Sequence, residues 1–191
     1  MKKLPDIKRM EALRKELRFN DRGIFEKAVY AFRLLEELLQ VYPNLIFKGG
    51  TSILLHIYPP VRLSIDIDIL LSVEEKAGLK DALDRIMLQS EWFDKMDEDI
   101  RTGKIPKVHY KFQYASQYST ESQYVLLDVV FSGNPYKKIL EKDLSKIPLF
   151  LTSDRTVVRV PTPEGLLGDK MTAISPRTIG IALKKNVQWK L

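Results

Sequence analysis

The spacing of hydrophobic residues predicts two helices at the start of the chain, over residues 6–18 and 22–41. The first segment is charged and amphipathic, while the second follows Asp21, a good N-cap residue. The apolar face of the second segment is wide, which favours a helix that packs on more than one side. Further helices are expected over 51–58, over 72–89 after a capping box, and over 162–174 with Pro163 first.

Shorter segments have the alternating or continuously apolar pattern of strands, over 45–48, 63–71, 107–115, 124–131 and 156–160. Residues 116–122 resemble a hairpin loop, residues 92–106 look irregular, and residues 135–146 leave a short helix open. This order predicts an α+β fold with a small mixed β-sheet flanked by helices. We expect N-terminal helices over 1–42, a core over 43–161 and a short C-terminal helical segment over 162–191.

Two acidic residues interrupt the apolar strand predicted over 63–71. Asp66 and Asp68 are two residues apart, so their side chains leave the strand on the same side. Desolvating two like charges is costly unless a positive charge lies between them. Hard carboxylate oxygens suit Mg²⁺, and Mn²⁺ takes similar ligands. We therefore predict that Asp66 and Asp68 bind a divalent metal.

A glycine pair lies just upstream, in Lys48-Gly49-Gly50-Thr51-Ser52. A tight turn of this kind exposes backbone N–H groups and hydroxyls, which can hold a phosphate. The combination of a phosphate site with paired carboxylates and a metal predicts phosphoryl or nucleotidyl transfer.

Asp128 is a third acidic residue in an apolar strand, the one predicted over 124–131. Alone, it could be a capped or edge residue. Together with Asp66 and Asp68 it could complete a site for two metals roughly 3.5–4 Å apart. One metal would organise a triphosphate and the other would activate an attacking hydroxyl, with Asp128 as the general base.

Three basic residues near these motifs each have two interpretations. Lys170 falls on the apolar stripe of the helix over 162–174, where it could extend to water or await a phosphate or aspartate partner. Lys48 has the same two interpretations. Arg62 could hold the Asp66/Asp68 pair or contact phosphate.

The histidines and aromatic residues carry a weaker signal. His56 and His109 lack metal-ligand spacing, and His56 is expected to be packed. Trp92, Phe93 and the tyrosines from 110 to 124 could stack on bases, but packing in the core and loops is the favoured use.

Composition narrows the class of protein. The 191 residues include 45% hydrophobic residues, which fits one soluble domain with at most a small appendage. The 31 basic and 25 acidic residues give a net charge of +6, compatible with a polyanionic partner. The absence of cysteine excludes disulfides and thiolate zinc sites. We expect a cytoplasmic protein, since the sequence has neither a signal-peptide pattern nor an apolar run long enough to span a membrane.

In four ordered motifs the chain resembles the AbiEii/AbiGii toxin group of the polymerase-β-type nucleotidyltransferase superfamily. The motifs are Lys48-Gly49-Gly50-Thr51, Arg62-x-Ser64-x-Asp66-Ile67-Asp68, Leu127-Asp128-Val129 and Glu164-x-Leu166-x-x-Asp169-Lys170. The run from Asp169 to Ile181 is also similar, so the resemblance covers roughly residues 40–181.

The resemblance implies transfer of a nucleoside monophosphate from an NTP, with release of pyrophosphate. It assigns Gly49, Gly50, Thr51 and Ser52 to the triphosphate, Asp66 and Asp68 to metal, Asp128 to completing the site and Lys170 to a phosphate. By position within the motifs, Lys48, Arg62 and Ser64 join the nucleotide-binding set. Several relatives are toxins of toxin–antitoxin or phage-defence pairs, some with tRNA 3′ ends as acceptors, so an RNA acceptor and a cognate antitoxin are expected.

The resemblance has one departure. Family members continue after the Lys170 helix into a larger helical part, whereas this sequence ends at Leu191. That difference bears on acceptor recognition. Two alternatives stay open: transfer to a protein hydroxyl (AMPylation), and a shortened, non-catalytic relative that binds a nucleotide or a partner.

Overall fold

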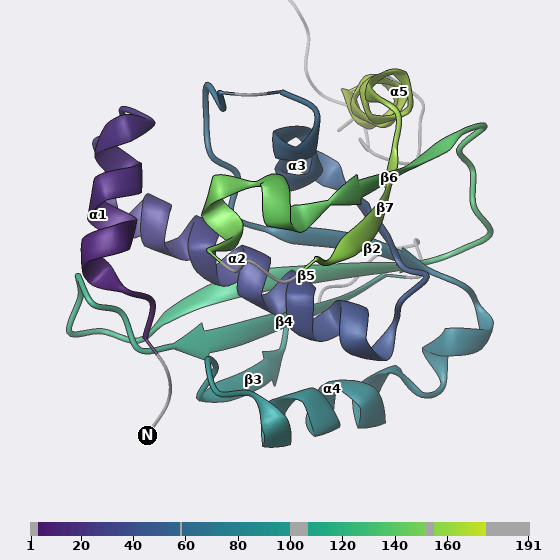
Figure 1. Ribbon diagram of the computed structural model, residues 1–191. Coiled ribbons are helices and arrows are strands. Elements are labelled where there is room, and N and C mark those ends of the chain that lie inside the picture. The colour runs from purple at the N-terminus through teal and green to yellow at the C-terminus, as the bar shows by residue number, and fades with distance from the viewer. Residues whose placement is uncertain (1–3, 58, 100–106, 152–154, 175–191) are drawn as a thin grey trace, which may run out of the picture.

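A mixed β-sheet of seven strands forms the centre of the protein (Figure 1). This computed structural model describes residues 4–57, 59–99, 107–151 and 155–174. From edge to edge the strands are β3 (Lys95–Glu98), β4 (Lys107–Tyr114), β5 (Gln123–Phe131), β2 (Ile67–Leu71), β1 (Ile46–Lys48), β7 (Val157–Pro161) and β6 (Ile139–Asp143). The pairs β2–β5 and β1–β7 are parallel and the other neighbours are antiparallel. The predicted mixed sheet with flanking helices is confirmed.

Helix α2 (Arg22–Val41) covers one face of this sheet (Figure 1) and contributes ten of the buried hydrophobic residues of the core. Its N-cap Asp21 accepts a hydrogen bond of 2.8 Å from the backbone N–H of Ile24, as the sequence predicts. Twelve of its residues are buried, around more than one side of the helix. The alternate residues of β2 and β5 that face α2 are fully buried: Ile67, Ile69, Val125, Leu127 and Val129. The opposite face of these strands therefore carries their polar residues.

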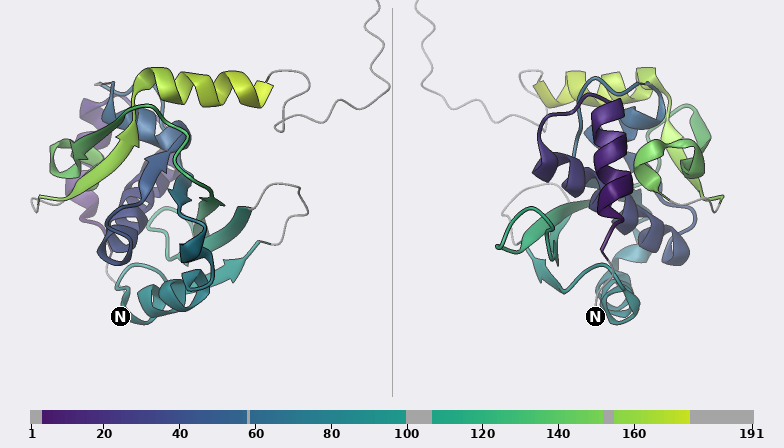
Figure 2. Two further views of the ribbon diagram at one scale, coloured as in Figure 1. Left: turned by 90° about the vertical axis from the view of Figure 1, so that its right-hand side faces the viewer. Right: turned by 60° about the vertical axis from the view of Figure 1, so that its left-hand side comes forward.

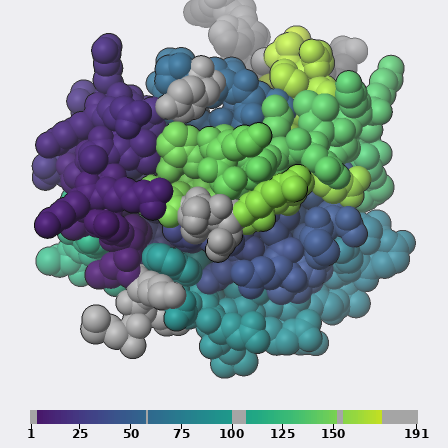
Figure 3. Space-filling model, viewed as in Figure 1, coloured from purple at the N-terminus to yellow at the C-terminus, as the bar shows by residue number. Residues whose placement is uncertain are grey.

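The remaining helices lie around the ends of the sheet. They are α1 (Ile7–Glu16), α3 (Gly49–Ser52), α4 (Leu79–Gln89) and α5 (Pro163–Ile174). Helix α5 follows β7 directly and lies at one end of the molecule, while α4 and the β3–β4 strands lie at the other (Figure 2, left). On the face shown in Figure 3, α1, β6, β7, α2 and α4 pack side by side.

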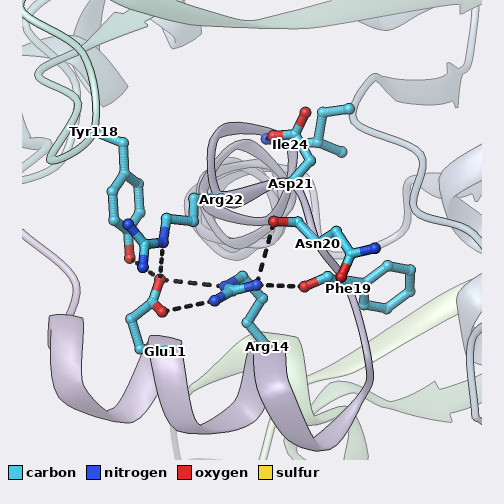
Figure 4. Close-up of polar contacts among 8 residues, drawn as sticks. All are labelled: Glu11, Arg14, Phe19, Asn20, Asp21, Arg22, Ile24 and Tyr118. Carbon is cyan, nitrogen blue, oxygen red and sulfur yellow. Dashed lines mark hydrogen bonds and ion pairs between the residues drawn. The ribbon is translucent and has the colours of Figure 1, made fainter.

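A charged network fixes α1 against α2 (Figure 4). Glu11 pairs with Arg14 at 2.9 Å and with Arg22 at 3.4 Å, and it accepts a hydrogen bond of 2.7 Å from the Tyr118 hydroxyl. Arg14 also donates to the backbone carbonyl of Phe19 at 2.5 Å. The hydrogen bonds that Glu11 accepts from Arg14 and Tyr118 lower its pKa to about 2. The network therefore connects α1, the turn before α2 and the loop after β4.

Several elements differ from the expected ones for local physical reasons. The helix expected from Ser72 begins at Leu79 instead. A single 3₁₀ turn (Glu74–Lys76) precedes it, and Gly78, a poor helix former, separates the two. The predicted capping contact does form, because the Ser72 backbone N–H donates to the Glu75 side chain. The helix expected over 51–58 is the four-residue α3 followed by the 3₁₀ turn Ile53–Leu55. The expectation of an irregular 92–106 was wrong for β3, and that of a helix in 135–146 was wrong for β6.

Some expectations fall outside the described residues. They are the helix end at Tyr58, residues 100–106, and the part of the family resemblance beyond Ile174. Within the described ranges, no helix has the length and apolar character needed to cross a membrane.

Candidate active site

Four polar side chains on adjacent strands lie in one row across the sheet. The sequence alone relates only some of them to one another. Lys48 on β1 is paired in register with Asp68 on β2, Asp68 with Asp128 on β5, and Asp128 with His109 on β4. Residues paired in register on adjacent strands project to the same face of a sheet. The row therefore lies on the face opposite α2, at the centre of the sheet.

The two central members of the row are carboxylates that repel one another. Burial, with a further contribution from the neighbouring charge of Asp128, raises the pKa of Asp68 to about 6, although Lys48 acts in the opposite direction. Burial and a neighbouring like charge both disfavour the ionised form of a carboxyl, and a bound cation would offset both. Oxygen donors in this situation suit a hard divalent cation, so the chemistry of Asp68 and Asp128 fits the predicted metal.

Asp66 is placed differently from the sequence expectation. Strand β2 begins at Ile67, so Asp66 precedes the strand, and its side chain is exposed. Its charge still acts on Asp68, whose pKa it helps to raise. Over the described ranges, no three Asp, Glu or His side chains are arranged to hold a metal ion. The metal-binding role of Asp66, Asp68 and Asp128 therefore stays a prediction.

The glycine pair brings the start of α3 against Asp68 and Ser64. Gly49 has a φ of +74°, and a Cβ added there would lie 1.9 Å from Oδ2 of Asp68. A Cβ on Gly50 would lie 2.8 Å from the hydroxyl of Ser64. Only glycine allows this approach, because any side chain would occupy the space of Asp68 or Ser64.

The two hydroxyls after the glycines are used within the turn. Thr51 donates to the backbone carbonyl of Asp66 at 2.5 Å, and Ser52 donates to that of Gly49 at 2.9 Å. Both residues are fully buried. These bonds hold the turn against the segment before β2, so the expectation that the hydroxyls lie open to a phosphate is not met. Phosphate binding by the backbone N–H groups of this turn stays a prediction.

Helix α5 supplies a second layer behind Lys48. The Lys48 ammonium lies 3.5 Å from Oδ2 of Asp169, and the Tyr136 hydroxyl donates to the same oxygen at 2.5 Å. Burial and this hydrogen bond raise the pKa of Tyr136, which keeps the hydroxyl protonated as a donor. The aspartate partner considered for Lys170 thus belongs to Lys48 instead.

The remaining predicted site residues line two small cavities beside the glycine turn. One of about 160 Å³ is lined by Gly50, Arg62, Ser64 and Lys170, together with Ile53 and Leu54. The other, of about 140 Å³, is lined by Lys48, Gly49, Asp68 and Lys170 among others. Lys170 is exposed, and of the predicted apolar stripe Leu166 is buried while Leu167 is exposed. The structure therefore brings Lys170, Arg62 and Ser64 to the glycine turn.

His109 is the residue that sequence reasoning missed. Its Nδ1 lies 2.6 Å from Oδ1 of Asp128, and its side chain is only 11% exposed. An ionised carboxylate has no hydrogen to give, so the imidazole donates and Asp128 accepts. The alternating pattern over 107–115 is the sequence signal that could have pointed to His109, because it places this residue on the polar face of its strand. Which strand lies beside it depends on the whole fold.

Two solved structures from Helicobacter pylori share the fold. JHP933 has a TM-score of 0.51 and 18% sequence identity, with 78% of this chain and 57% of that chain covered. A candidate nucleotidyltransferase has a TM-score of 0.52 and 16% identity, with 77% of this chain and 59% of that chain covered. This chain therefore spans less than three fifths of either structure. No curated protein matches the sequence.

The strongest comparison is with a family model. The model of the AbiEii nucleotidyl transferase toxins, a type IV toxin–antitoxin system, matches residues 33–180. This range includes every member of the row and of the glycine turn, as well as Lys170. Because the match covers well over half of the sequence and the predicted resemblance is confirmed, the chain belongs to the AbiEii nucleotidyl transferase toxin family.

Proposed function

We propose that the protein is a metal-dependent nucleotidyltransferase that transfers a nucleoside monophosphate from an NTP to an acceptor hydroxyl on RNA. The observation that carries this proposal is the row of Lys48, Asp68, Asp128 and His109 beside the glycine turn. Membership of a type IV toxin–antitoxin family supports a toxin role and a cognate antitoxin. An RNA 3′ end, such as that of tRNA, is the acceptor that we favour.

In this proposal the acidic residues of the site bind the metal and the basic residues bind the triphosphate. Asp68 and Asp128, with Asp66, would hold Mg²⁺ or Mn²⁺, which when bound would neutralise phosphate charge and orient the reacting groups. Lys48, Lys170 and Arg62, with the backbone of Gly49 and Gly50, would bind the triphosphate near the two cavities. Asp169 and Tyr136 fix the position of Lys48.

The transfer itself needs one proton acceptor. The acceptor oxygen attacks the α-phosphorus, the bond from that phosphorus to the bridging oxygen breaks, and pyrophosphate leaves. The hydroxyl proton passes to Asp128, which is the general base. His109 holds the carboxylate of Asp128 in one orientation through the 2.6 Å contact.

A panel of labelled NTPs tests the proposal. The protein is incubated with each α-labelled NTP and either total RNA or total protein, with Mg²⁺ or with EDTA. We expect label in RNA, an equal release of pyrophosphate, and no transfer in EDTA. Label in protein instead would establish AMPylation, and heat of NTP binding without pyrophosphate would indicate the non-catalytic relative.

His109 gives a second prediction. His109→Leu should lower kcat by about 10- to 100-fold, which is the usual effect of removing a partner that orients a metal ligand. The KM for the NTP should change little, because His109 does not line the cavities near the glycine turn. Steady-state kinetics with the labelled NTP measure both constants.

The matched control is His109→Asn, whose amide places a donor where Nδ1 lies and should recover part of the rate. Equal rates for the two variants would show that the contact with Asp128 does not orient the base. Urea unfolding of both proteins would separate this effect from loss of folding.

A further inference from the structure

One face of the β4–β5 pair is mainly polar and is partly exposed to solvent. The residues that point toward α2 are at most 5% exposed: Tyr110, Phe112, Tyr114, Val125, Leu127 and Val129. The alternate residues on the other face are all partly or fully exposed: Lys107, His109, Lys111, Gln113, Tyr124, Leu126, Asp128 and Val130. This face continues outward from the row that contains Asp128, because His109 pairs with Asp128 in the same register that pairs Gln113 with Tyr124.

Tyr124 differs from the other aromatic residues near it. Phe93, Phe112 and Tyr114 are fully buried and take part in ring contacts of the core, such as the stacking of Tyr30 on Tyr114 at 3.7 Å. Tyr124 is instead 42% exposed. The core therefore accounts for the other rings but not for this one.

Two lysines from different elements meet at the Tyr124 ring. Lys27 of α2 places its ammonium 4.6 Å from the ring centroid, and Lys111 of β4 places its own 5.4 Å away. Cations at these distances are attracted by the electrons of the ring. Tyr124 thus holds two positive charges together at the surface, although like charges repel.

The acidic groups nearby leave these ammonium groups able to bind an anion. Lys111 reaches Asp99 only at 3.7 Å. Asp97 is bound more tightly by Lys95, at 2.6 Å, and by Gln113, at 2.6 Å. Burial lowers the pKa of Lys27, while the charge of Asp66 acts in the opposite direction. A phosphate between the two lysines would interact with both positive charges. It would not have to displace a close ion pair of Lys111 with Asp97 or Asp99.

The distance to the catalytic row matches a short piece of nucleic acid. Tyr124 precedes Asp128 by four residues on β5, on the same face. At the rise of a β-strand this separates the two by about 13 Å. About four nucleotides span that length at the 3.4 Å spacing of a stacked strand.

We propose that Lys27, Lys111 and Tyr124 form a binding track for the acceptor polynucleotide, upstream of its reacting 3′ end. The 3′ hydroxyl lies at Asp128, and a backbone phosphate about four nucleotides away lies between the two lysines. When the two ammonium groups turn from the ring to this phosphate, the exposed ring of Tyr124 is open to a neighbouring base, and base–aromatic stacking tolerates any sequence. This inference rests on the proposed function and adds the surface by which RNA would be recognised.

Binding of a 5′-fluorescent single-stranded RNA 12-mer, followed by anisotropy over a series of salt concentrations, tests the track. The measurement uses the full chain carrying Asp68→Asn, which removes turnover. In this background we expect Lys27→Gln/Lys111→Gln to weaken binding at least tenfold at low salt. The slope of log K against log salt should become shallower by about 0.7, because the two lysines share one phosphate and each lost phosphate contact to a single strand contributes about 0.7. Tyr124→Leu should weaken binding at least fivefold with the slope unchanged.

The control is Lys76→Gln/Lys80→Gln, which removes the same charge at two exposed lysines on the 3₁₀ turn before α4 and on α4 itself. Equal weakening by the control, an unchanged slope in the Lys27/Lys111 variant, or competition by an acidic peptide but not by RNA would overturn the track. Binding in the Asp68→Asn background requires no reaction, so failure of the track is distinct from failure of transfer in the labelled-NTP panel.

Discussion

Asp68→Asn is expected to reduce nucleotidyl transfer by about a thousandfold or more, and at pH 8 to make the metal-free protein more stable. The activity falls because the central carboxylate of the row is lost, and with it cation-based charge stabilisation of several kcal/mol. Label transfer from the preferred NTP measures this loss. Unchanged incorporation by the variant would remove the catalytic centre proposed here.

The gain in stability follows from the pKa of the same carboxyl. In the folded protein the pKa of Asp68 is raised from the ordinary 3.8 to about 6, so the folded state retains a proton that the unfolded chain releases. The stability from this proton is complete at low pH and is lost as the pH rises through 6. Asparagine cannot ionise, so Asp68→Asn should gain about 2–3 kcal/mol at pH 8 and almost nothing at pH 4.

Urea unfolding in EDTA at the two pH values measures this difference. Asp84→Asn is the matched control, because Asp84 is exposed on α4 and pairs with Lys80 at 3.1 Å. It should change the free energy of unfolding by no more than about 0.5 kcal/mol at either pH. A destabilised Asp68→Asn protein at pH 8 would show that favourable contacts of the Asp68 carboxylate outweigh the cost of its burial and of the neighbouring charge of Asp128.

The parts of the fold that could be predicted are those with strong local patterns. The expected second helix coincides with α2, and the helix expected after Thr162 coincides with α5, because each has a capping residue and a clear first position. Strand β3 could not be predicted, since its four residues, Lys-Met-Asp-Glu, have no apolar pattern. It forms because its backbone pairs with β4, and that pairing depends on the whole chain.

The candidate site shows the same division between local and long-range information. Asp68 and the glycine turn could be found because each is a short motif with its own chemistry. The neighbours of those motifs could not. Asp169 reaches Lys48 from a helix 121 residues later in the chain, and His109 reaches Asp128 only because β4 pairs with β5 in one register. A shift of one residue in that register would turn His109 into the core.

Gly49→Ala is expected to remove transfer as completely as Asp68→Asn and also to destabilise the fold. The added Cβ would lie 1.9 Å from Oδ2, 2.5 Å from Cγ and 2.7 Å from Cβ of Asp68. Rotating the carboxylate away cannot relieve the contact with Cβ, so β1 and β2 would have to separate. A non-glycine residue at φ +74° adds a cost of about 1–2 kcal/mol. We expect a total loss of about 3 kcal/mol or more in the free energy of urea unfolding.

A double-mutant cycle separates these two causes. In an Asp68→Gly background the side chain that clashes is absent, so Gly49→Ala should cost only the backbone strain of about 1–2 kcal/mol. The difference between the two backgrounds measures the steric contact directly. Gly133→Ala is the control, since a Cβ at Gly133 meets nothing within 4 Å. If Gly49→Ala cost the same in both backgrounds, the approach of the turn to Asp68 would have no energetic role. The glycine would then be required only by its backbone conformation, and the turn could hold a phosphate without touching the carboxylate row.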